Sequence, residues 1–215
     1  ISCSLVGSEM CIRDSMCTGE WCYAQPSGDL VVGDAWIGGK LYHFSGDGIL
    51  RTGACEENGT YIVCDEDGTK LGELTHDGWS LIGGNYYYLE NGVVMRDGAY
   101  KLPDGKWYVF EKSGRMLSSV RSEKRWLSEN GDALTGWINR GGAWYYADPD
   151  TAEVCTGFQW INGAQYYLKS DGTMLVGEKV IDGKLIMTDD SGAIKGSFLL
   201  EDGWSYHDGL SLIHI

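Results

Sequence analysis

Short runs rich in aromatic and β-branched residues recur along the chain, and each run lies between two glycine-containing turns. The pattern is clearest in GWSLIGGNYYYLENGVVMRDG from Gly78, GWINRGGAWYYADPDTAEVCTG from Gly136 and GFQWINGAQYYLKSDGTMLVG from Gly157. The period is about 20 residues, and a unit this short cannot bury its apolar face without neighbours. The pattern therefore predicts an all-β fold, a solenoid of stacked β-hairpins built from repeats of about 20 residues.

Each unit contains a dipeptide that tolerates positive φ at both residues, as a two-residue hairpin turn requires. The pairs are Gly38-Gly39, Asn58-Gly59, Gly83-Gly84, Asp104-Gly105, Gly141-Gly142, Asn162-Gly163, Asp182-Gly183 and Asp202-Gly203. Each pair predicts a β-hairpin. Helix is disfavoured throughout, because glycine and β-forming aromatic residues interrupt every window long enough to hold one.

A second glycine turn follows each aromatic run, and an apolar residue lies two or three positions beyond it. The turn glycines are Gly48, Gly68, Gly92, Gly114, Gly131, Gly172 and Gly192. The apolar residues include Met95, Met116, Leu134, Met174 and Ile194, which we expect to plug the space between stacked hairpins. Carboxylates also cluster at these turns, at Asp65 to Asp67, Asp148 with Asp150, and Asp189 with Asp190. We interpret them as turn residues rather than as an acid–base pair or a calcium loop.

Because successive side chains of a strand point to opposite faces, the count from the hairpin glycine separates core from surface. The third and fifth residues are mostly apolar and are predicted to form the core: Tyr42, Ile62, Tyr87, Tyr108, Tyr145, Tyr166 and Ile186, then Phe44, Cys64, Leu89, Phe110, Ala147, Leu168 and Thr188. The second and fourth residues vary more and include His43 and Gln165. The opposite face is therefore predicted to be at least partly exposed to solvent.

On this outer face two units are predicted to carry a complete aromatic triad, because a two-residue turn makes cross-strand pairs of their rings. The triads are Trp79, Tyr86 and Tyr88, and Trp137, Trp144 and Tyr146. Two further sets are incomplete: Tyr100 with Trp107, where Val109 fills the third place, and Phe158 with Tyr167, where Gln165 intervenes. Clustered exposed rings cage a quaternary ammonium by cation–π attraction or stack against sugars. The alternative is that the rings only cover one another between hairpins.

A family resemblance rests on Gly136-Trp137, on Gly142 followed by Trp144-Tyr145-Tyr146, and on the ending from Gly172 through Met174 to Gly177. These residues resemble the cell-wall-binding or choline-binding repeat of bacterial surface proteins, and the resemblance covers nearly all of residues 19–209. It implies ligand sites between consecutive hairpins. Similar repeats occur in the glucan-binding tails of secreted glucosyltransferases and in the receptor-binding tails of clostridial toxins.

The resemblance implies a choline site with Trp137, Trp144 and Tyr146 as its wall, Tyr167 of the next hairpin closing it and Met174 nearby. Trp79, Tyr86 and Tyr88 match similarly, with tyrosine in place of the second tryptophan, and Trp107 is a further candidate. The chain departs from the family pattern at Asp34, Ala54 and Glu178, where an aromatic residue is expected, and in the loss of the hairpin turn around Arg125 and Trp126.

The two ends of the chain differ from the repeats. Ser4 to Ser15 and Leu210 to Ile215 resemble the conceptual translation of sequencing-adapter DNA. We therefore expect residues 1–15 to be an unstructured artefact, residues 16–209 to form the repeat array and residues 210–215 to be a second artefact. On this interpretation the chain is an excerpt from a larger protein that is secreted or held at a bacterial cell surface, and its signal peptide is lost.

Charge and composition exclude several function classes. The net charge is −14, with 31 acidic and 17 basic residues, so the chain lacks the basic stripe that a nucleic-acid partner needs. Membrane insertion is not expected either. The spacing of Cys17 and Cys22 is not that of a zinc or redox site, and no histidine accompanies a Cys or Ser in a nucleophile motif. No cofactor, metal site or catalytic residue is predicted.

Cys55 and Cys64 flank one predicted hairpin. With Asn58-Gly59 as the turn, Cys55 lies opposite Ile62, and Cys64 is a diagonal neighbour beyond comfortable disulfide reach. Free thiols are predicted for both.

These observations favour a non-catalytic module that anchors a larger secreted protein to the choline or carbohydrate of a cell-wall or cell-surface polymer. Two alternatives stay open at this point. One is the glycan- or glucan-binding tail of an extracellular toxin or glucosyltransferase, and the other is a structural stalk that spaces domains.

Overall fold

The computed structural model describes residues 20–122, 124–199, 204–207 and 210–214. It divides into two compact units, residues 1–118 and 119–215. Residues 1–15 lie outside the described residues, and β21 covers Leu210–His214 of the C-terminal string. No helix in the described part of the chain is long and apolar enough to cross a membrane.

The regular elements of the described residues are β-strands. The N-terminal unit holds β1 (Gly33–Ile37), β2 (Lys40–Phe44), β3 (Gly53–Glu57), β4 (Thr60–Cys64), β5 (Lys70–Leu74), β6 (Gly78–Ile82), β7 (Asn85–Glu90), β8 (Val93–Val94), β9 (Gly98–Lys101) and β10 (Trp107–Phe110). The C-terminal unit holds β11 (Arg121–Ser122), β12 (Arg125–Trp126), β13 (Gly136–Arg140), β14 (Ala143–Ala147), β15 (Gly157–Ile161), β16 (Ala164–Leu168), β17 (Glu178–Ile181), β18 (Lys184–Thr188), β19 (Ile194–Leu199), β20 (Trp204–His207) and β21 (Leu210–His214).

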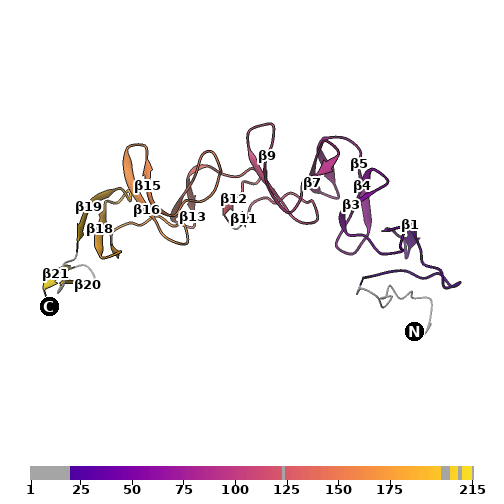
Figure 1. Cartoon of the computed structure of the whole chain (residues 1–215), viewed down its shortest axis with the longest axis horizontal. Helices are drawn as coiled ribbons and strands as arrows, with labels where there is room; N and C mark the ends of the chain where they lie inside the picture. Colours follow the sequence, from indigo (N-terminus) through magenta and orange to yellow (C-terminus); the bar gives the residue numbers. More distant parts are fainter. Residues whose placement is uncertain (1–19, 123, 200–203, 208–209, 215) are drawn as a thin grey trace. The chain divides into compact units, whose positions relative to one another are not determined.

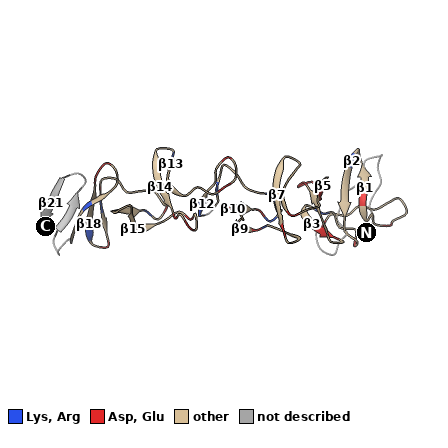
Figure 2. Ribbon diagram, turned by 90° about the horizontal axis from the view of Figure 1, so that it is seen from above, with Lys and Arg blue, Asp and Glu red and all other residues tan. Residues whose placement is uncertain are grey.

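Each sheet in the described residues is an antiparallel hairpin, in three cases extended by a third strand: β3-β4-β5, β6-β7-β8 and β17-β18-β19. Within each unit the hairpins follow one another in sequence order (Figure 1). The prediction of an all-β fold made of successive hairpins is confirmed. Figure 2 shows acidic and basic residues scattered over the hairpins of both units.

Local turn chemistry explains where the hairpins form. Six of the predicted dipeptides have positive φ at both residues: Gly38-Gly39, Asn58-Gly59, Gly83-Gly84, Gly141-Gly142, Asn162-Gly163 and Asp182-Gly183. Only glycine, asparagine and aspartate adopt this conformation without a large steric penalty. These six turns are confirmed, and Asp202-Gly203 lies outside the described residues.

At Asp104-Gly105 the predicted hairpin forms between β9 and β10, but its turn is not a two-residue turn, because only Gly105 has positive φ. Leu102 N donates to Lys106 O at 2.9 Å and Gly105 N donates to Leu102 O at 2.9 Å, so the connection between β9 and β10 is longer. A two-residue turn would place Pro103 opposite Lys106, where a backbone N–H is required, and proline has none. The register shifts as a result, and Tyr100 pairs with Tyr108 instead of Val109.

A second departure concerns the segment around Arg125 and Trp126, where the sequence predicted the loss of the hairpin turn. Strands β11 and β12 pair antiparallel in the structure, with Arg121 opposite Trp126 and Ser122 opposite Arg125. A short hairpin is therefore retained, although the usual dipeptide is missing.

The second turns are also confirmed, because each of the seven predicted glycines has positive φ. Asp65 Oδ1 accepts hydrogen bonds from Asp67 N at 3.0 Å and Thr69 N at 2.7 Å, and Asp148 Oδ1 accepts one from Thr151 N at 2.8 Å. These carboxylates hold their own turns, as predicted.

The residue two positions after the second-turn glycine ties one hairpin to the hairpin before it. Met116 N donates to Tyr86 O at 2.8 Å, and Met174 N donates to Trp144 O at 2.7 Å. Met95 and Met116 also pack against a buried cluster of Leu102, Tyr108 and Phe110. The plug interpretation is confirmed for these methionines.

The alternation of strand residues predicted most of the core. The third and fifth positions are buried, except Tyr145, Tyr166 and Thr188, which are half-buried. The prediction of a wet outer face is wrong in the first hairpins of the N-terminal unit, where His43 and Val63 are buried. Burial of His43 is tolerated because its Nδ1 lies 2.6 Å from Asp34 Oδ1, so the imidazole keeps a hydrogen bond.

Candidate functional site

The best candidate for a ligand site is a cavity of about 340 Å³ in the C-terminal unit. Trp137 and Trp144 come from the β13–β14 hairpin, Tyr166 from β16, and Met174 from the turn that follows β16. Asp190 and Ser191 complete the lining from the turn between β18 and β19. Three successive hairpins therefore contribute to one cavity.

The rings around the cavity meet edge to face. Trp137 has its ring centroid 6.4 Å from Trp144, at an interplanar angle of 85°, and 4.8 Å from Tyr166, at 69°. Edge-to-face contact leaves the electron-rich faces of some rings directed away from their neighbours. Trp144 is 44% exposed, so one side of its indole is accessible to a ligand.

Tyr146 supports this wall from its own hairpin. It pairs with Trp137 across the strands, as predicted, and the two ring centroids are 5.2 Å apart. The cavity is lined by Trp137 and Trp144 on this hairpin, so Tyr146 orients Trp137 from outside the lining. The predicted triad is present, with two of its rings on the cavity.

The ring that the next hairpin contributes is Tyr166, not Tyr167 as the sequence suggested. Tyr167 pairs with Phe158 instead, with ring centroids 4.9 Å apart. The error has a geometric cause: stacking turns the core face of each hairpin toward the preceding one, so the third residue after the hairpin glycine reaches back to Trp137. The same ring is therefore both core residue and cavity wall.

Met174 closes the far side of the cavity, where the turn after β18 approaches it closely. A Cβ atom added at Gly192 would lie 2.5 Å from the sulfur and the methyl carbon of Met174, and Gly192 has a φ of +80°. Glycine adopts this φ without strain, whereas a larger residue would be strained and would force the end of the Met174 side chain to move. This approach brings Asp190 and Ser191 to the aromatic wall.

The neighbouring carboxylates Asp189 and Asp190 have different roles. Asp189 Oδ1 accepts hydrogen bonds from Ser191 N at 2.9 Å and Ala193 N at 3.1 Å. Hydrogen bonds from Ser191 and Lys195 lower the pKa of Asp189 to about 2. Asp189 is thus the turn residue that the sequence predicted, whereas Asp190 is an exposed carboxylate on the cavity. The turn interpretation alone missed this second role.

The chemistry of the cavity favours a small organic cation. Aromatic faces attract cations through their quadrupole, the Met174 thioether is polarisable and apolar, and Asp190 supplies a negative charge. Among the described residues, no basic side chain lines the cavity. A quaternary ammonium group needs this combination, because it has no N–H to donate and is held by ring faces and by charge.

The N-terminal unit contains a second constellation of the same form. Trp79 lies 5.0 Å from Tyr88, 6.2 Å from Tyr86 and 4.9 Å from Tyr108, as ring centroid distances. The corresponding angles are 69°, 89° and 70°, close to those around Trp137. Met116 holds the place of Met174, since its N–H bonds to Tyr86 O. The second predicted triad is therefore formed.

Comparison with known families agrees with this geometry. Residues 155–195 match the choline-binding repeat family, and residues 135–150 match the cell wall binding repeat family. These two segments are similar to choline-binding and cell wall binding repeats. Both matches fall in the C-terminal unit, on the hairpins that supply Trp137, Trp144, Tyr166 and Met174.

Solved and curated proteins with similar repeats were also found. The structure of CbpJ from Streptococcus pneumoniae TIGR4 superposes with a TM-score of 0.51 at 24% identity, over 81% of this chain and 62% of that one. Glucosyltransferase-I of Streptococcus downei is 25% identical over 78% of this chain and 10% of its own length. Glucosyltransferase-S of Streptococcus mutans is 29% identical over 76% of this chain and 12% of its own length. The chain thus spans about a tenth of these curated relatives.

Trp107 is a further predicted site residue, and it lies in the β9–β10 hairpin of the N-terminal unit. The shifted register of β9 and β10 pairs it with Lys101. Tyr108, one residue later, makes the ring contact with Trp79 that the sequence did not predict. The misplacement follows directly from the longer turn at Pro103.

One further aromatic pair is covered by cations of the chain itself. Trp126 and Tyr145 have ring centroids 5.4 Å apart, and the Arg121 guanidinium carbon lies 5.4 Å from the first ring and 5.7 Å from the second. Arg140 lies 5.8 Å from the Trp126 ring. Arginine side chains of the chain itself therefore make the cation–π contacts with these two rings.

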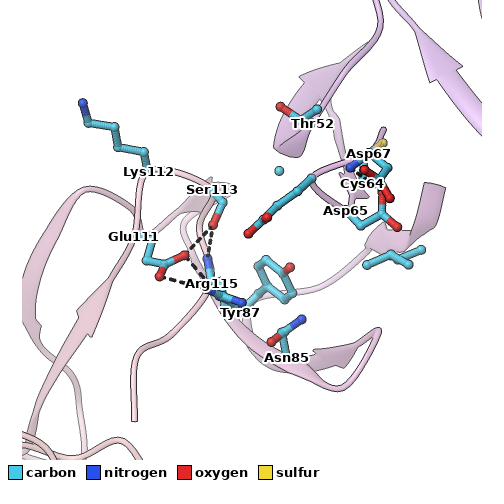
Figure 3. A pocket seen from close by; sticks show the side chains of 13 residues that line it. Thr52, Cys64, Asp65, Asp67, Asn85, Tyr87, Glu111, Lys112, Ser113 and Arg115 are labelled. Carbon is cyan, nitrogen blue, oxygen red and sulfur yellow. Dashed lines mark hydrogen bonds and ion pairs between the residues drawn. The ribbon is translucent and has the colours of Figure 1, made fainter. Parts of the chain in front are cut away.

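A larger polar cavity of about 610 Å³ lies in the N-terminal unit. Figure 3 shows Arg115 bonded to Glu111 beside Tyr87, with Asp65 and Asp67 across from them. The Arg115 guanidinium donates to both Glu111 oxygens, at 3.1 and 2.9 Å. Planar polar groups beside an aromatic ring suit a hydroxyl-rich ligand better than a quaternary ammonium.

Cys55 and Cys64 form no disulfide and are free thiols, as predicted. The predicted register is also correct, because Cys55 pairs with Ile62. A hydrogen bond from the Cys64 thiol lowers the pKa of Cys55 to about 7. Within the described residues no group of three or more His, Cys, Asp or Glu side chains is placed to hold a metal ion.

Proposed function

We propose that the chain is a surface-binding module whose C-terminal unit binds choline between Trp137, Trp144 and Tyr166. The observation that supports this most strongly is the meeting of these rings with Met174 and the Asp190 carboxylate in one cavity. The match of the same hairpins to choline-binding repeats points to the same ligand. In this role the chain anchors a larger protein, secreted or held at the cell surface, to a bacterial wall polymer that displays choline.

The repeats act in this proposal by binding alone. The curated relatives are glucosyltransferases of which the chain covers about a tenth, so catalysis in such proteins is assigned to their other parts. We infer the same division for the whole protein from which these repeats come.

Calorimetric titration of the full chain with choline tests the proposal. We compare choline with its neutral isostere 3,3-dimethylbutan-1-ol, which has the same shape without the charge. Choline is expected to bind at least about tenfold more tightly, because cation–π attraction contributes about 0.5–2 kcal/mol per ring. Equal affinities, or no binding of choline, would refute the choline site.

The Asp190 carboxylate provides a more specific prediction. Replacing Asp190 with asparagine is expected to weaken choline binding about fivefold at low salt, because an exposed charge contributes about 1 kcal/mol or less. High salt should reduce this difference through screening. The matched control is Asp182→Asn, which removes the same charge from a hairpin turn where asparagine also tolerates positive φ. If Asp190 does not face the ligand, calorimetry should show that the two variants lose the same amount of affinity for choline.

A glycan ligand is the second candidate function, and the polar cavity beside Tyr87 is the observation that favours it. The likeness to two glucosyltransferases over most of the chain is compatible with it. Titration with isomalto-oligosaccharides forms a second arm of the same calorimetry. Binding that Glu111→Gln weakens and Trp144→Ala leaves unchanged would support the glycan site. A structural stalk would respond to neither ligand.

A further inference from the structure

Two arginine side chains converge on one tryptophan in the C-terminal unit. The guanidinium carbon of Arg121, on β11, lies 5.4 Å from the centroid of the Trp126 ring, and that of Arg140, on β13, lies 5.8 Å from it. This arginine pair therefore comes from two successive hairpins. Because like charges repel, the convergence has an electrostatic cost that the attraction to the indole offsets only in part.

Neither guanidinium of the arginine pair is neutralised by a carboxylate. Among the residues that the structure describes, no ion pair joins Arg121 or Arg140 to an acidic side chain. Arg121 donates one hydrogen bond, from Nη2 to the backbone oxygen of Asp171 at 3.1 Å. Arg140 is exposed, and its guanidinium donates to no described residue. Most N–H groups of the pair are therefore open to a ligand.

The acidic residues that contact the β11–β12 hairpin are committed to other partners. Asp171 Oδ1 accepts hydrogen bonds from Thr173 N at 2.9 Å and from Thr173 Oγ1 at 2.7 Å, and these bonds lower the pKa of Asp171. Glu153 lies 3.1 Å from Arg125 Nη2 and 3.8 Å from Lys124 Nζ. In a chain with a net charge of −14, the arginine pair is thus a local concentration of positive charge.

The aromatic rings hold the donors in place. The Arg121 guanidinium carbon also lies 5.7 Å from the Tyr145 ring, so two rings contact one guanidinium. A guanidinium that contacts rings through its face keeps the N–H groups at its edge free to donate, and its rigid fork loses little entropy on binding. The adjacent turn residue is Gly172, where even an added Cβ would lie 3.7 Å from Arg121 Nη2. No side chain at this position covers the donor.

The geometry of the donors selects the kind of anion. A carboxylate has two oxygens in one plane, and the fork of a single guanidinium satisfies both of them. A phosphate group directs its oxygens tetrahedrally, so it accepts hydrogen bonds from two guanidinium groups that approach from different hairpins. The arginine pair therefore suits a phosphate group better than a carboxylate.

We propose that Arg121 and Arg140 bind a phosphate group, with Trp126 holding both guanidinium groups in position. The C-terminal unit then has an anion site beside the hairpin that supplies Trp137 and Trp144 to the aromatic cavity. This arrangement suits a polymer that carries phosphate as well as ammonium groups. The inference does not rest on the choline proposal, because it concerns other residues and its test uses ligands without an ammonium group.

The test is an NMR titration of the full chain at low ionic strength, which follows the indole N–H of Trp126 and the Nε–H of Arg140. Glycerol 3-phosphate represents a phosphomonoester and dimethyl phosphate a phosphodiester, so the two arms distinguish the sources of the phosphate. Acetate at the same ionic strength is the control. Saturable shifts of both signals are expected with at least one phosphate ester, and acetate should bind at least about fivefold more weakly.

Variants make the assignment specific. Arg140→Gln is expected to weaken phosphate binding about fivefold, because one of the two charged donors is lost. Arg96→Gln is the matched control, since Arg96 is an exposed arginine of the N-terminal unit and its loss removes the same charge away from the pair. Thermal unfolding checks that both variants are folded. The proposal is overturned if neither ester shifts the two signals saturably, if acetate binds as well as the esters, or if the two variants bind phosphate equally.

Discussion

Replacing Trp144 with alanine is expected to weaken choline binding by about 30-fold, the equivalent of about 2 kcal/mol for one desolvated cation–π contact. Trp144 lines the cavity and is 44% exposed, so its ring is available to the ligand and contributes little to the core. The indole also contacts Trp137 edge to face, which fixes the shape of the wall. Intrinsic tryptophan fluorescence during titration, checked by calorimetry, measures the loss.

The control for this variant is Trp160→Ala in the neighbouring hairpin. Trp160 is 74% exposed and lies outside the cavity lining. Its substitution therefore removes an indole ring of the same size and leaves the cavity lining unchanged. Affinity should then stay within about twofold of the parent, as for independent positions. Unfolding curves of both variants exclude a general loss of structure. If Trp144→Ala binds choline as well as the parent, the cavity is not the choline site.

The second large effect concerns the fold. Gly172→Ala is expected to destabilise the C-terminal unit by about 2–4 kcal/mol, from strain at positive φ and from overpacking. Gly172 has a φ of +86°, and an added Cβ would lie 2.6 Å from Val154 and 3.3 Å from Tyr145. Val154 bridges to Ala147 and has little room to withdraw. Denaturant unfolding followed by tryptophan fluorescence measures the change.

Gly177→Ala separates the two causes. Gly177 has a φ of +94° and nothing within 4 Å of an added Cβ. Its backbone N–H, which bonds to Thr188 Oγ1, survives the substitution. This variant should lose only the conformational part, about 1–2 kcal/mol. Equal destabilisation by the two variants would show that the contact between turn and neighbouring hairpin is not tight.

Sequence alone predicted the local features of the fold well. Pairs such as Asn162-Gly163 specify their turn by φ preference, which depends on two residues only. The same logic failed at Asp104-Gly105 because Pro103 removes a donor that the short turn needs. Cross-strand pairing then placed Trp137 against Tyr146 correctly, since register follows from the turn.

The site itself was predicted only in part, because it is assembled across repeats. Strand alternation does not determine which face of one hairpin packs against the next hairpin. The sequence therefore assigned Tyr166 to the core alone. Asp190 comes from the turn of a hairpin two repeats beyond Trp137, and its residue type also suits an ordinary turn. Its place on the cavity depends on the close approach of the Gly192 turn to Met174, which the sequence does not show.

The most direct test of the choline site is the intermolecular nuclear Overhauser effect between choline and protein methyl groups. In a chain with labelled methionine methyls, the N-methyl protons of choline are expected to give cross-peaks to Met174, because this side chain lines the cavity with Trp137 and Trp144. The cross-peaks should disappear in Trp144→Ala at the same choline concentration. Bound choline without any cross-peak to Met174 would contradict the site, and choline that does not bind at all would contradict the function.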